Sequence, residues 1–275
     1  MGQRSIARVP GCEDVAVEAP DTRNLWNANA PAWTELARAG FDVYRDLVNT
    51  PAFFAMLPPV SGLVGLDLGC GEGHNTRLLA ASGADVVALD LSEYFIESAA
   101  AESQRGIRFV LGDGAHLPFR SSTFDFATAF MSLMDVGKPE RALQEVGRVL
   151  KPEGFVQFSV LHPATSTPIR HWVDDEAGHR HALAVGDYFY EGPLTDRWTF
   201  GAAPADVRDR HEPFTIAYAR RTLAGWINAV LGAGFTIEAV DEPHADEQTA
   251  RTHPEVADTR IAPYFLVLRA RTAAQ

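Results

Sequence analysis

The stretch from Leu66 to His74 restricts the fold of this chain more than any other. A mostly apolar run, residues 62–68, leads into glycines at alternate positions, Gly69, Gly71 and Gly73, and the residues that follow have helical character. Glycine allows positive φ angles and a close approach of the backbone to a ligand, and a helix N-terminus presents free N–H groups. We therefore predict a strand, a glycine turn and a helix start that form a loop for a nucleotide-type cofactor.

An acidic residue, Asp67, stands inside the otherwise apolar strand, just before the turn. A carboxylate buried without a partner is costly, so its presence there indicates a purpose. We interpret Asp67 as an acidic anchor of the cofactor loop. The alternative is a tight strand–helix turn that binds no ligand.

Strand-like and helix-like segments alternate from residue 62 to residue 161. Alternation of this kind predicts right-handed βαβ units in a parallel sheet, and nearly continuous apolar strands fit burial on both faces. Ligands of such sheets bind beyond the carboxyl ends of the strands. The predicted strands are 63–68, 85–90, 107–111, 124–130 and 155–161, with a turn at 152–154 before the last of them. Their ends bring polar groups to one edge, namely Asp67, Asp90, Asp113, residues 130–135 and His162.

The segments before and after these alternating strands and helices have different sequence patterns. Residues 21–59 are helical and rich in aromatic side chains, and Asn29 is predicted to cap a helix with Pro31 in its first turn. Residues 162–220 have no helical period, which indicates short strands and loops in a functional insert. The predicted organisation is a flexible tail at 1–20, a helical lid at 21–59, a core at 60–161 and 221–272, and a substrate-capping insert at 162–220.

The last segment, 221–272, predicts a helix capped by Thr222 and then two strands, 235–240 and 264–271. These two strands are expected to close the sheet as an antiparallel hairpin.

Charge, cysteine content and hydropathy limit the partners of the chain. The net charge of -12 argues against a nucleic-acid backbone as partner. Two cysteines, Cys12 and Cys70, cannot make a disulfide framework, which suits a reducing cytosol. No apolar run approaches the roughly 20 residues of a membrane helix, and residues 1–20 lack a signal-peptide core. We expect a cytoplasmic protein without nucleic-acid or membrane partners, as a monomer or homodimer.

The glycine spacing distinguishes between cofactors. A dinucleotide fingerprint requires Gly-x-Gly-x-x-Gly/Ala, and His74 occupies its last position here. The observed spacing of Gly69, Gly71 and Gly73, with Asp67 two residues earlier, resembles the first motif of the class I S-adenosylmethionine-dependent methyltransferases.

Further segments are similar to motifs of the same family. Asp90 resembles its ribose-binding acid and Gly112-Asp113-Gly114 its adenine-binding motif. Residues 117–119 with 122–125 resemble the approach to its fourth strand, and residues 148–154 resemble its "RVLKPGG" turn, with Glu153 where glycine is commoner. The resemblance is close over residues 60–161 and extends to 221–271 in element order. It implies an α/β fold with a Rossmann-like, seven-stranded, mostly parallel sheet, helices on both faces and an antiparallel last strand.

The resemblance also implies a cofactor, S-adenosyl-L-methionine, with S-adenosyl-L-homocysteine as product, and no metal. Asp67 would orient the ammonium group, Asp90 would hold the ribose, and Asp113 would bind the adenine edge. Leu91 would pack on the adenine, and the Phe130 carbonyl would face the ammonium side. The implied cofactor-binding set is Asp67, Gly69, Cys70, Gly71, Gly73, Asn75, Asp90, Leu91, Asp113, Gly114, Phe130 and Met131.

The methyl acceptor is less constrained by the sequence. His162 follows the fifth predicted strand, and its ordinary pKa of about 6.5 suits proton removal near neutrality, which makes it a candidate catalytic base. The alternative for His162 is a structural histidine in a His-Pro turn. His179 and His181 lack further ligands at metal spacing. The predicted substrate-binding residues are Trp33, Tyr44, His162, Trp172, Tyr188 and His211.

These observations predict methyl transfer by SN2 displacement to an O, N, S or C atom of a small-molecule metabolite or natural product. The chain looks most like bacterial members of the family. Two other functions remain open at this point. One is a non-catalytic module that binds the cofactor, and the other is a nicotinamide-dependent oxidoreductase, which His74 disfavours.

Overall fold

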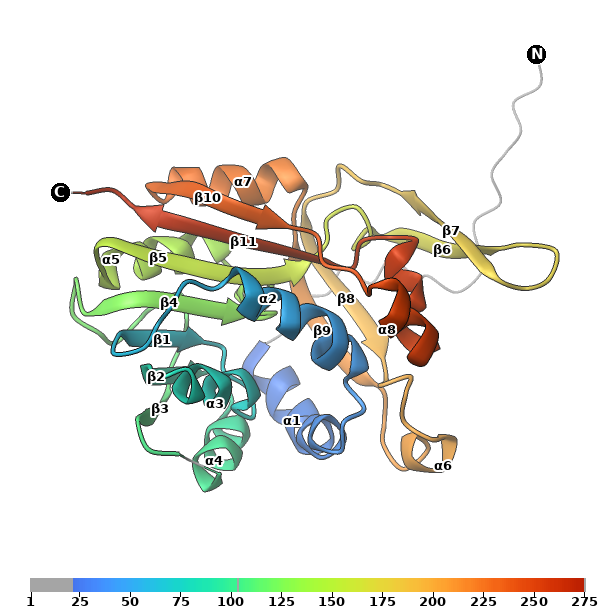
Figure 1. Cartoon of the computed structure of the whole chain (residues 1–275), viewed down its shortest axis with the longest axis horizontal. Coiled ribbons are helices and arrows are strands. Elements are labelled where there is room, and N and C mark those ends of the chain that lie inside the picture. The colour runs from blue at the N-terminus through green and yellow to red at the C-terminus, as the bar shows by residue number, and fades with distance from the viewer. Residues whose placement is uncertain (1–21, 103, 275) are drawn as a thin grey trace, which may run out of the picture.

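The computed structural model describes residues 22–102 and 104–274, and its centre is a seven-stranded sheet in the order β10-β11-β5-β4-β1-β2-β3 (Figure 1). The predicted tail at 1–20 lies outside the described residues. Strands β1 to β5 run parallel, and β11 pairs antiparallel with both β5 and β10. The predicted fold class and the closing antiparallel hairpin are therefore confirmed. The sheet strands are β1 (Val64–Leu68), β2 (Asp85–Asp90), β3 (Ile107–Leu111), β4 (Phe124–Phe130), β5 (Leu150–Leu161), β10 (Phe235–Asp241) and β11 (Phe265–Thr272).

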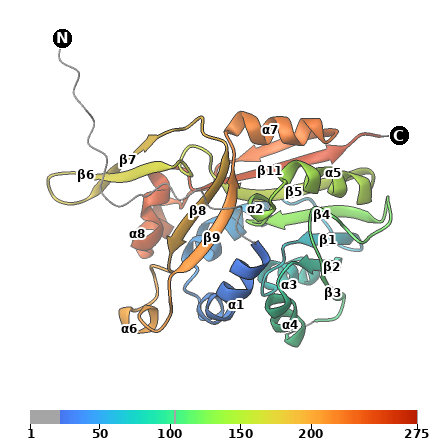
Figure 2. The ribbon, with the colours of Figure 1, turned by 180° about the vertical axis from the view of Figure 1, so that it is seen from behind.

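Helices cover both faces of this sheet. The view of Figure 1 shows α2 (Thr50–Met56) and α3 (His74–Ala81) in front of the strands, and Figure 2 shows α5 (Pro139–Val149) and α7 (Leu223–Gly232) against the other face. Helix α4 (Glu93–Ala101) packs against β2 and β3.

Successive side chains of a strand point to opposite faces, and this decides where the residues of β1 go. Leu66 and Leu68 are buried in the main core with residues of α5 and α7. Asp67 therefore points to the other face, where α3 lies, and bonds Thr76 of that helix.

The carboxyl edge of the sheet carries the remaining elements. Helix α1 (Thr22–Arg38) and two antiparallel hairpins lie beyond the ends of the parallel strands, as Figures 1 and 2 both show. The hairpins are β6 (Ile169–Asp174) with β7 (Arg180–Gly186), and β8 (Gly192–Trp198) with β9 (Phe214–Arg220). The shorter elements are a π-helical turn (Arg45–Asn49), 3₁₀ turns (Leu133–Asp135, Pro254–Arg260), α6 (Ala205–Arg208) and α8 (Glu247–Thr252).

An aromatic cluster fixes α1 to the β8–β9 hairpin. Trp33 of α1 contacts Trp198, Phe200 and Phe214 with ring-centroid distances of 5.0–5.2 Å. Its other edge contacts Trp26 at 5.3 Å in a T-shaped arrangement. Contacts of this geometry each add about 1 kcal/mol to the burial term, so the cluster holds the helix over the edge of the sheet.

Two local predictions are wrong. Asn29 does not cap a helix, because α1 runs through both Asn29 and Pro31. The Asn29 side chain instead donates to the backbone carbonyl of Thr215 in β9, at 2.8 Å. The turn at 152–154 lies inside β5 as a bulge, since the β4–β5 register passes from Phe124–Leu150 to Phe126–Phe155. The caps are as expected, with Ser92 and Thr222 accepting from backbone N–H groups at the starts of α4 and α7.

Within residues 22–102 and 104–274, the helices are all too short or too polar to span a membrane.

Candidate functional site

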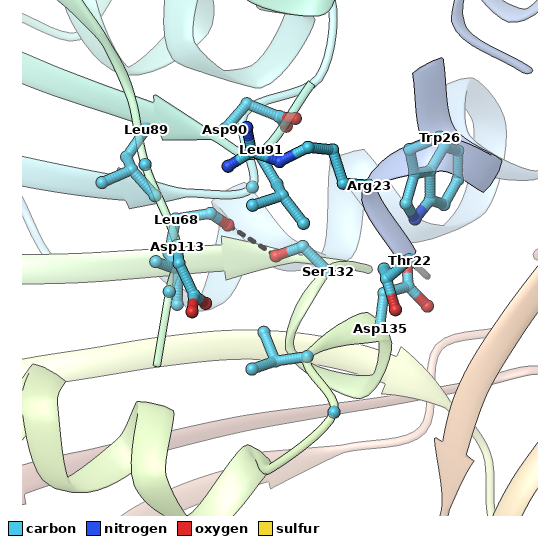
Figure 3. Close-up of a pocket in the computed structure, with 15 residues that line it drawn as sticks. Thr22, Arg23, Trp26, Leu68, Leu89, Asp90, Leu91, Asp113, Ser132 and Asp135 are labelled. Carbon is cyan, nitrogen blue, oxygen red and sulfur yellow. Dashed lines mark hydrogen bonds between the residues drawn. The ribbon is translucent and has the colours of Figure 1, made fainter. Parts of the chain in front are cut away.

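A cavity of about 310 Å³ lies at the carboxyl ends of β1 and β2, closed on one side by the start of α1 (Figure 3). We call it the edge cavity. Its place at the strand ends is where parallel α/β sheets bind ligands, and its volume is in the range of small-molecule sites. Its walls combine apolar and acidic side chains with glycine backbone, from Thr22, Arg23, Trp26, Leu68, Gly69, Leu89, Asp90, Leu91, Gly112, Asp113, Gly114, Ser132, Asp135, Val136 and Gly137.

The glycine loop forms the floor of the edge cavity. Gly69 has a φ of 69°, and the N–H groups of Gly69 and Cys70 both donate to the Leu89 carbonyl, at 2.7 and 3.0 Å. A Cβ atom at position 69 would lie 2.3 Å from the Cβ of Ser132. Ser132 is itself held, because its hydroxyl donates to the Leu68 carbonyl at 2.5 Å. Gly69 is therefore required both by its backbone conformation and by the lack of space.

Asp90 links the loop to the wall of the cavity. One carboxylate oxygen accepts from the N–H of Gly71 and the other from the N–H of Ser92, both at 2.8 Å. The side chain is buried, and burial raises the pKa of Asp90 to about 6, although the two backbone hydrogen bonds lower it. Each oxygen keeps a free lone pair, so the carboxylate can still accept from two neighbouring hydroxyl groups.

Asp113 stands at another wall, after β3. Its Oδ1 accepts from the Ala115 N–H at 2.9 Å, and its Oδ2 lies 3.0 Å from Nδ1 of His116. The carboxylate is about half exposed, and the backbone of Gly114 lies beside it in the same wall. This wall offers an acceptor and a backbone donor side by side, as recognition of an amino-purine edge requires.

Asp135 is the third acid of the edge cavity. It ends the 3₁₀ turn that follows β4, and its Oδ1 is shielded from solvent with no hydrogen-bond partner among the described residues. Burial and the negative charge of Asp90 raise the pKa of Asp135 well above its ordinary value. A buried acceptor without a donor is costly, which makes Asp135 the most unusual polar group of this site.

The predicted cofactor residues divide into two sets. The edge cavity is lined by Gly69, Asp90, Leu91, Asp113 and Gly114 from that prediction. Asp67 instead lies beneath the loop, where its two oxygens accept from the hydroxyls of Thr76 and Thr128 at 2.6 and 2.8 Å. The predicted residues that do not line the cavity are Asp67, Cys70, Gly71, Gly73, Asn75, Phe130 and Met131.

The loop and strand-end residues of that second set have identifiable partners. Asn75 accepts from the Thr50 hydroxyl at 3.3 Å, and the N–H of Met131 donates to the Ser159 carbonyl at 3.0 Å. The Phe130 ring packs on Phe53 with centroids 5.2 Å apart. Their contacts with a cofactor stay predictions.

The predicted acceptor residues do not meet at the edge cavity. Trp33 does not line the cavity but contacts Trp26, which does. The Tyr44 hydroxyl donates to the Asp258 carboxylate at 2.9 Å. Trp172 stacks near Tyr264, with centroids 6.4 Å apart.

Tyr188 and His211 lie elsewhere on the insert. The Tyr188 hydroxyl accepts from the Leu223 N–H at 3.2 Å, and His211 lies 3.7 Å from Glu35. The substrate-binding role of these residues stays a prediction.

Both ring nitrogens of His162 are engaged. Nε2 lies 2.7 Å from a carboxylate oxygen of Glu242, and Nδ1 accepts from the Ala164 N–H at 3.1 Å. Burial lowers the pKa of His162, although Glu242 raises it. This arrangement fits a structural histidine better than a catalytic base, since a base requires a ring nitrogen that is free to accept a proton.

Sequence reasoning missed part of the cavity wall. Thr22, Arg23 and Trp26 come from α1, and their position depends on the packing of Trp33. Asp135 lies shortly after a predicted strand, which is a sequence signal for a site residue. Nothing in the sequence showed that its Oδ1 would lack a hydrogen-bond partner among the described residues. Among the residues that the structure describes, histidine, cysteine and acidic side chains form no cluster that could hold a metal ion.

Comparisons with known proteins identify a methyltransferase family. Residues 66–158 match a family described as a methyltransferase domain. The chain is 33% identical over 123 residues to the malonyl-[acyl-carrier protein] O-methyltransferase of Pectobacterium atrosepticum, covering 44% of this chain and 48% of that protein. It is 42% identical over 100 residues to the demethylmenaquinone methyltransferase of Clavibacter sepedonicus, covering 36% of this chain and 41% of that protein. These alignments therefore span less than half the length of either curated relative.

A solved structure gives a longer match. An S-adenosylmethionine-dependent methyltransferase from Mesorhizobium loti superposes with a TM-score of 0.68 at 32% identity, covering 80% of this chain and 96% of that one. Since the match extends over nearly the whole of a relative with this identity and fold, the chain belongs to the class I S-adenosylmethionine-dependent methyltransferases.

Proposed function

We propose that this protein transfers a methyl group from S-adenosylmethionine to a small-molecule acceptor. The observation that carries the proposal is the meeting of Gly69, Asp90 and Asp113 at one cavity, although they come from three different strand ends. S-adenosylmethionine, when bound, supplies a methyl group on a positively charged sulfur.

The residues of the edge cavity fit the adenosine part of this cofactor. Asp90 keeps a free lone pair on each oxygen for the two ribose hydroxyls. Asp113 and the Gly114 N–H would bind the adenine edge, and Leu91 would pack on its face. The backbone of Gly69 leaves room for the methionine portion. The cavity is not lined by Asp67, Asn75 or Phe130. Their predicted contacts with the cofactor would have to be made through water molecules or after the loop rearranges.

The lid and the insert would complete the site for the acceptor. Helix α1 carries Trp26 to the cavity wall, and the β8–β9 hairpin holds α1 there through Trp33. Closing this side would exclude water and align the reactants, an effect worth several kcal/mol in bimolecular reactions. We propose the boundaries 21–59 for the lid and 162–220 for the insert.

A small molecule is the acceptor class that the chain fits best. The net charge of -12 disfavours nucleic acid. The two curated relatives are named for demethylmenaquinone and for malonyl-[acyl-carrier protein]. Those substrates belong to the relatives. We propose a metabolite acceptor, a cytoplasmic location, and a monomer or homodimer.

A turnover assay tests the proposal. The purified protein is incubated with S-adenosylmethionine and fractionated small-molecule extracts, and S-adenosylhomocysteine is measured by mass spectrometry. We expect release that depends on an extract fraction and is lost in Asp90→Asn. Binding of the cofactor without release in any fraction would instead favour the non-catalytic module, and oxidation of a nicotinamide cofactor would favour the oxidoreductase.

A further inference from the structure

The proposed binding of adenosine gives Asp135 no role. Of the three acids that line the edge cavity, Asp90 and Asp113 accept backbone hydrogen bonds, whereas the buried Oδ1 of Asp135 accepts none from the described residues. A buried acceptor without a donor destabilises the folded protein. Such a group calls for an explanation, and a catalytic role is one that acids in a cleft commonly have.

The position of Asp135 separates it from the adenine end. Figure 3 shows Asp113 and Asp135 on opposite sides of the hydrogen bond between Ser132 and Leu68, with Asp135 facing Thr22 of α1. With adenine at Asp113 and ribose at Asp90, the part of the cavity beside Asp135 is left for the reacting sulfur and the acceptor.

The pKa of Asp135 depends on the charged groups around it, including those of a bound ligand. Asp90, at the end of β2, raises its pKa, and Asp113 adds a second carboxylate to the cavity wall. From α1, Arg23 reaches the same cavity. A cationic sulfur next to Asp135 would oppose the field of Asp90 and favour the ionised carboxylate, since an opposite charge within about 4–6 Å shifts a pKa by 1–3 units.

We propose that Asp135 is the catalytic carboxylate of the reacting centre, where it accepts the proton of the methyl acceptor. This inference rests on the proposed function. As the acceptor atom bonds to the methyl carbon, the carbon–sulfur bond breaks with its electron pair on sulfur, and the acceptor's proton passes to Asp135. The acceptor therefore carries an O–H, N–H or S–H group at the methylated atom.

The position of Asp135 beside the reacting sulfur is tested by calorimetry in the absence of a methyl acceptor. S-adenosylmethionine and S-adenosylhomocysteine differ by the methyl group and the charge on sulfur, so the ratio of their affinities isolates that charge. Both ligands are titrated between pH 5.5 and 8, in buffers of different ionisation enthalpy, into wild type, Asp135→Asn and Asp113→Asn. Asp113→Asn is the matched control, an acid of the same cavity at the adenine end.

We expect the wild-type affinity ratio, S-adenosylmethionine over S-adenosylhomocysteine, to rise with pH. S-adenosylmethionine binding would release more protons, because the carboxyl ionises in the complex. Asp135→Asn should flatten this pH dependence and lower the ratio about tenfold, the effect of one pKa unit. Asp113→Asn should weaken both ligands equally. The melting temperature of Asp135→Asn should not fall, since the substitution removes an acid that the negative charge of Asp90 destabilises.

Equal losses for both ligands in Asp135→Asn, with the pH dependence unchanged, would overturn the inference and leave the proposed function standing. If wild type bound neither ligand, the proposed function itself would fail. Should Asp135→Asn not fold, Asp135→Ala replaces it in the same titrations.

Discussion

At the residue scale, Gly69 does the most to shape the cavity floor. Gly69→Ala would place a Cβ atom 2.3 Å from Ser132 at a φ of 69°, and Ser132 cannot move without breaking its bond to the Leu68 carbonyl. Gly71→Ala is the matched control, since its φ is also positive but its Cβ would meet nothing within 4 Å. We expect urea denaturation to show a loss above about 3 kcal/mol for Gly69→Ala and about 1 kcal/mol for Gly71→Ala. Equal losses would contradict this account of the loop.

Asp90 is expected to give ligand binding a pH dependence. Under the proposed function the ribose hydroxyls would donate to its carboxylate, and burial raises the pKa of Asp90 in the free protein to about 6. Binding therefore favours the ionised form, and the affinity for S-adenosylhomocysteine should fall about tenfold per pH unit below pH 6, until the pKa of the complex is reached. Asp90→Asn should bind weakly at every pH. A flat wild-type profile from pH 7 to pH 5, measured by calorimetry, would contradict the ribose role.

At the scale of elements, one buried acid joins the glycine loop to the lid. Glu72 is 4% exposed and accepts from Arg77 at 2.8 Å and from Arg38 of α1 at 3.2 Å. A third arginine, Arg45, approaches it at 3.6 Å. Burial raises the pKa of Glu72, but the arginines lower it by more, so the net shift is downward. The ion pairs therefore stabilise the folded protein when Glu72 is ionised.

Glu72→Gln should lower the free energy of unfolding by about 3 kcal/mol at pH 7, because it removes the buried anion that Arg38, Arg45 and Arg77 share. The pKa is lowered in the folded state, so this difference should persist above the ordinary glutamate pKa of about 4.3 and disappear as the pH falls below it. Glu102→Gln is the control, since Glu102 is half exposed although it also pairs with Arg38. Its cost should stay below about 1 kcal/mol. Equal costs in urea denaturation would refute the anchoring role.

The elements also show where sequence reasoning succeeds. The strands, the caps Ser92 and Thr222 and the glycine turn were predicted because their signals are local, within a few residues. Asn29 was misassigned because its partner, Thr215, lies 186 residues away. An Asn side chain can accept at a helix start through its oxygen or donate to a distant strand through its nitrogen, as Asn29 does here, and only the fold decides between the two.

At the scale of the whole molecule, part of the edge cavity could be predicted from the sequence, whereas the residues predicted for the acceptor do not meet there. Asp90 ends β2 and Asp113 follows β3, and both stand in segments that resemble family motifs. Tyr44 and Trp172 were expected at the acceptor, but they join a group around Asp258 and Tyr264. Such clusters are made by segments far apart in the chain, and neither spacing nor composition encodes which of them meet.

The central claim is that the edge cavity binds S-adenosylmethionine. It is tested most directly by isothermal titration of the purified protein with S-adenosylmethionine, S-adenosylhomocysteine and NAD⁺. We predict one site per chain for the first two ligands, lost in Asp90→Asn, and no binding of NAD⁺. Absence of heat from both S-adenosyl ligands at millimolar concentration would contradict the claim.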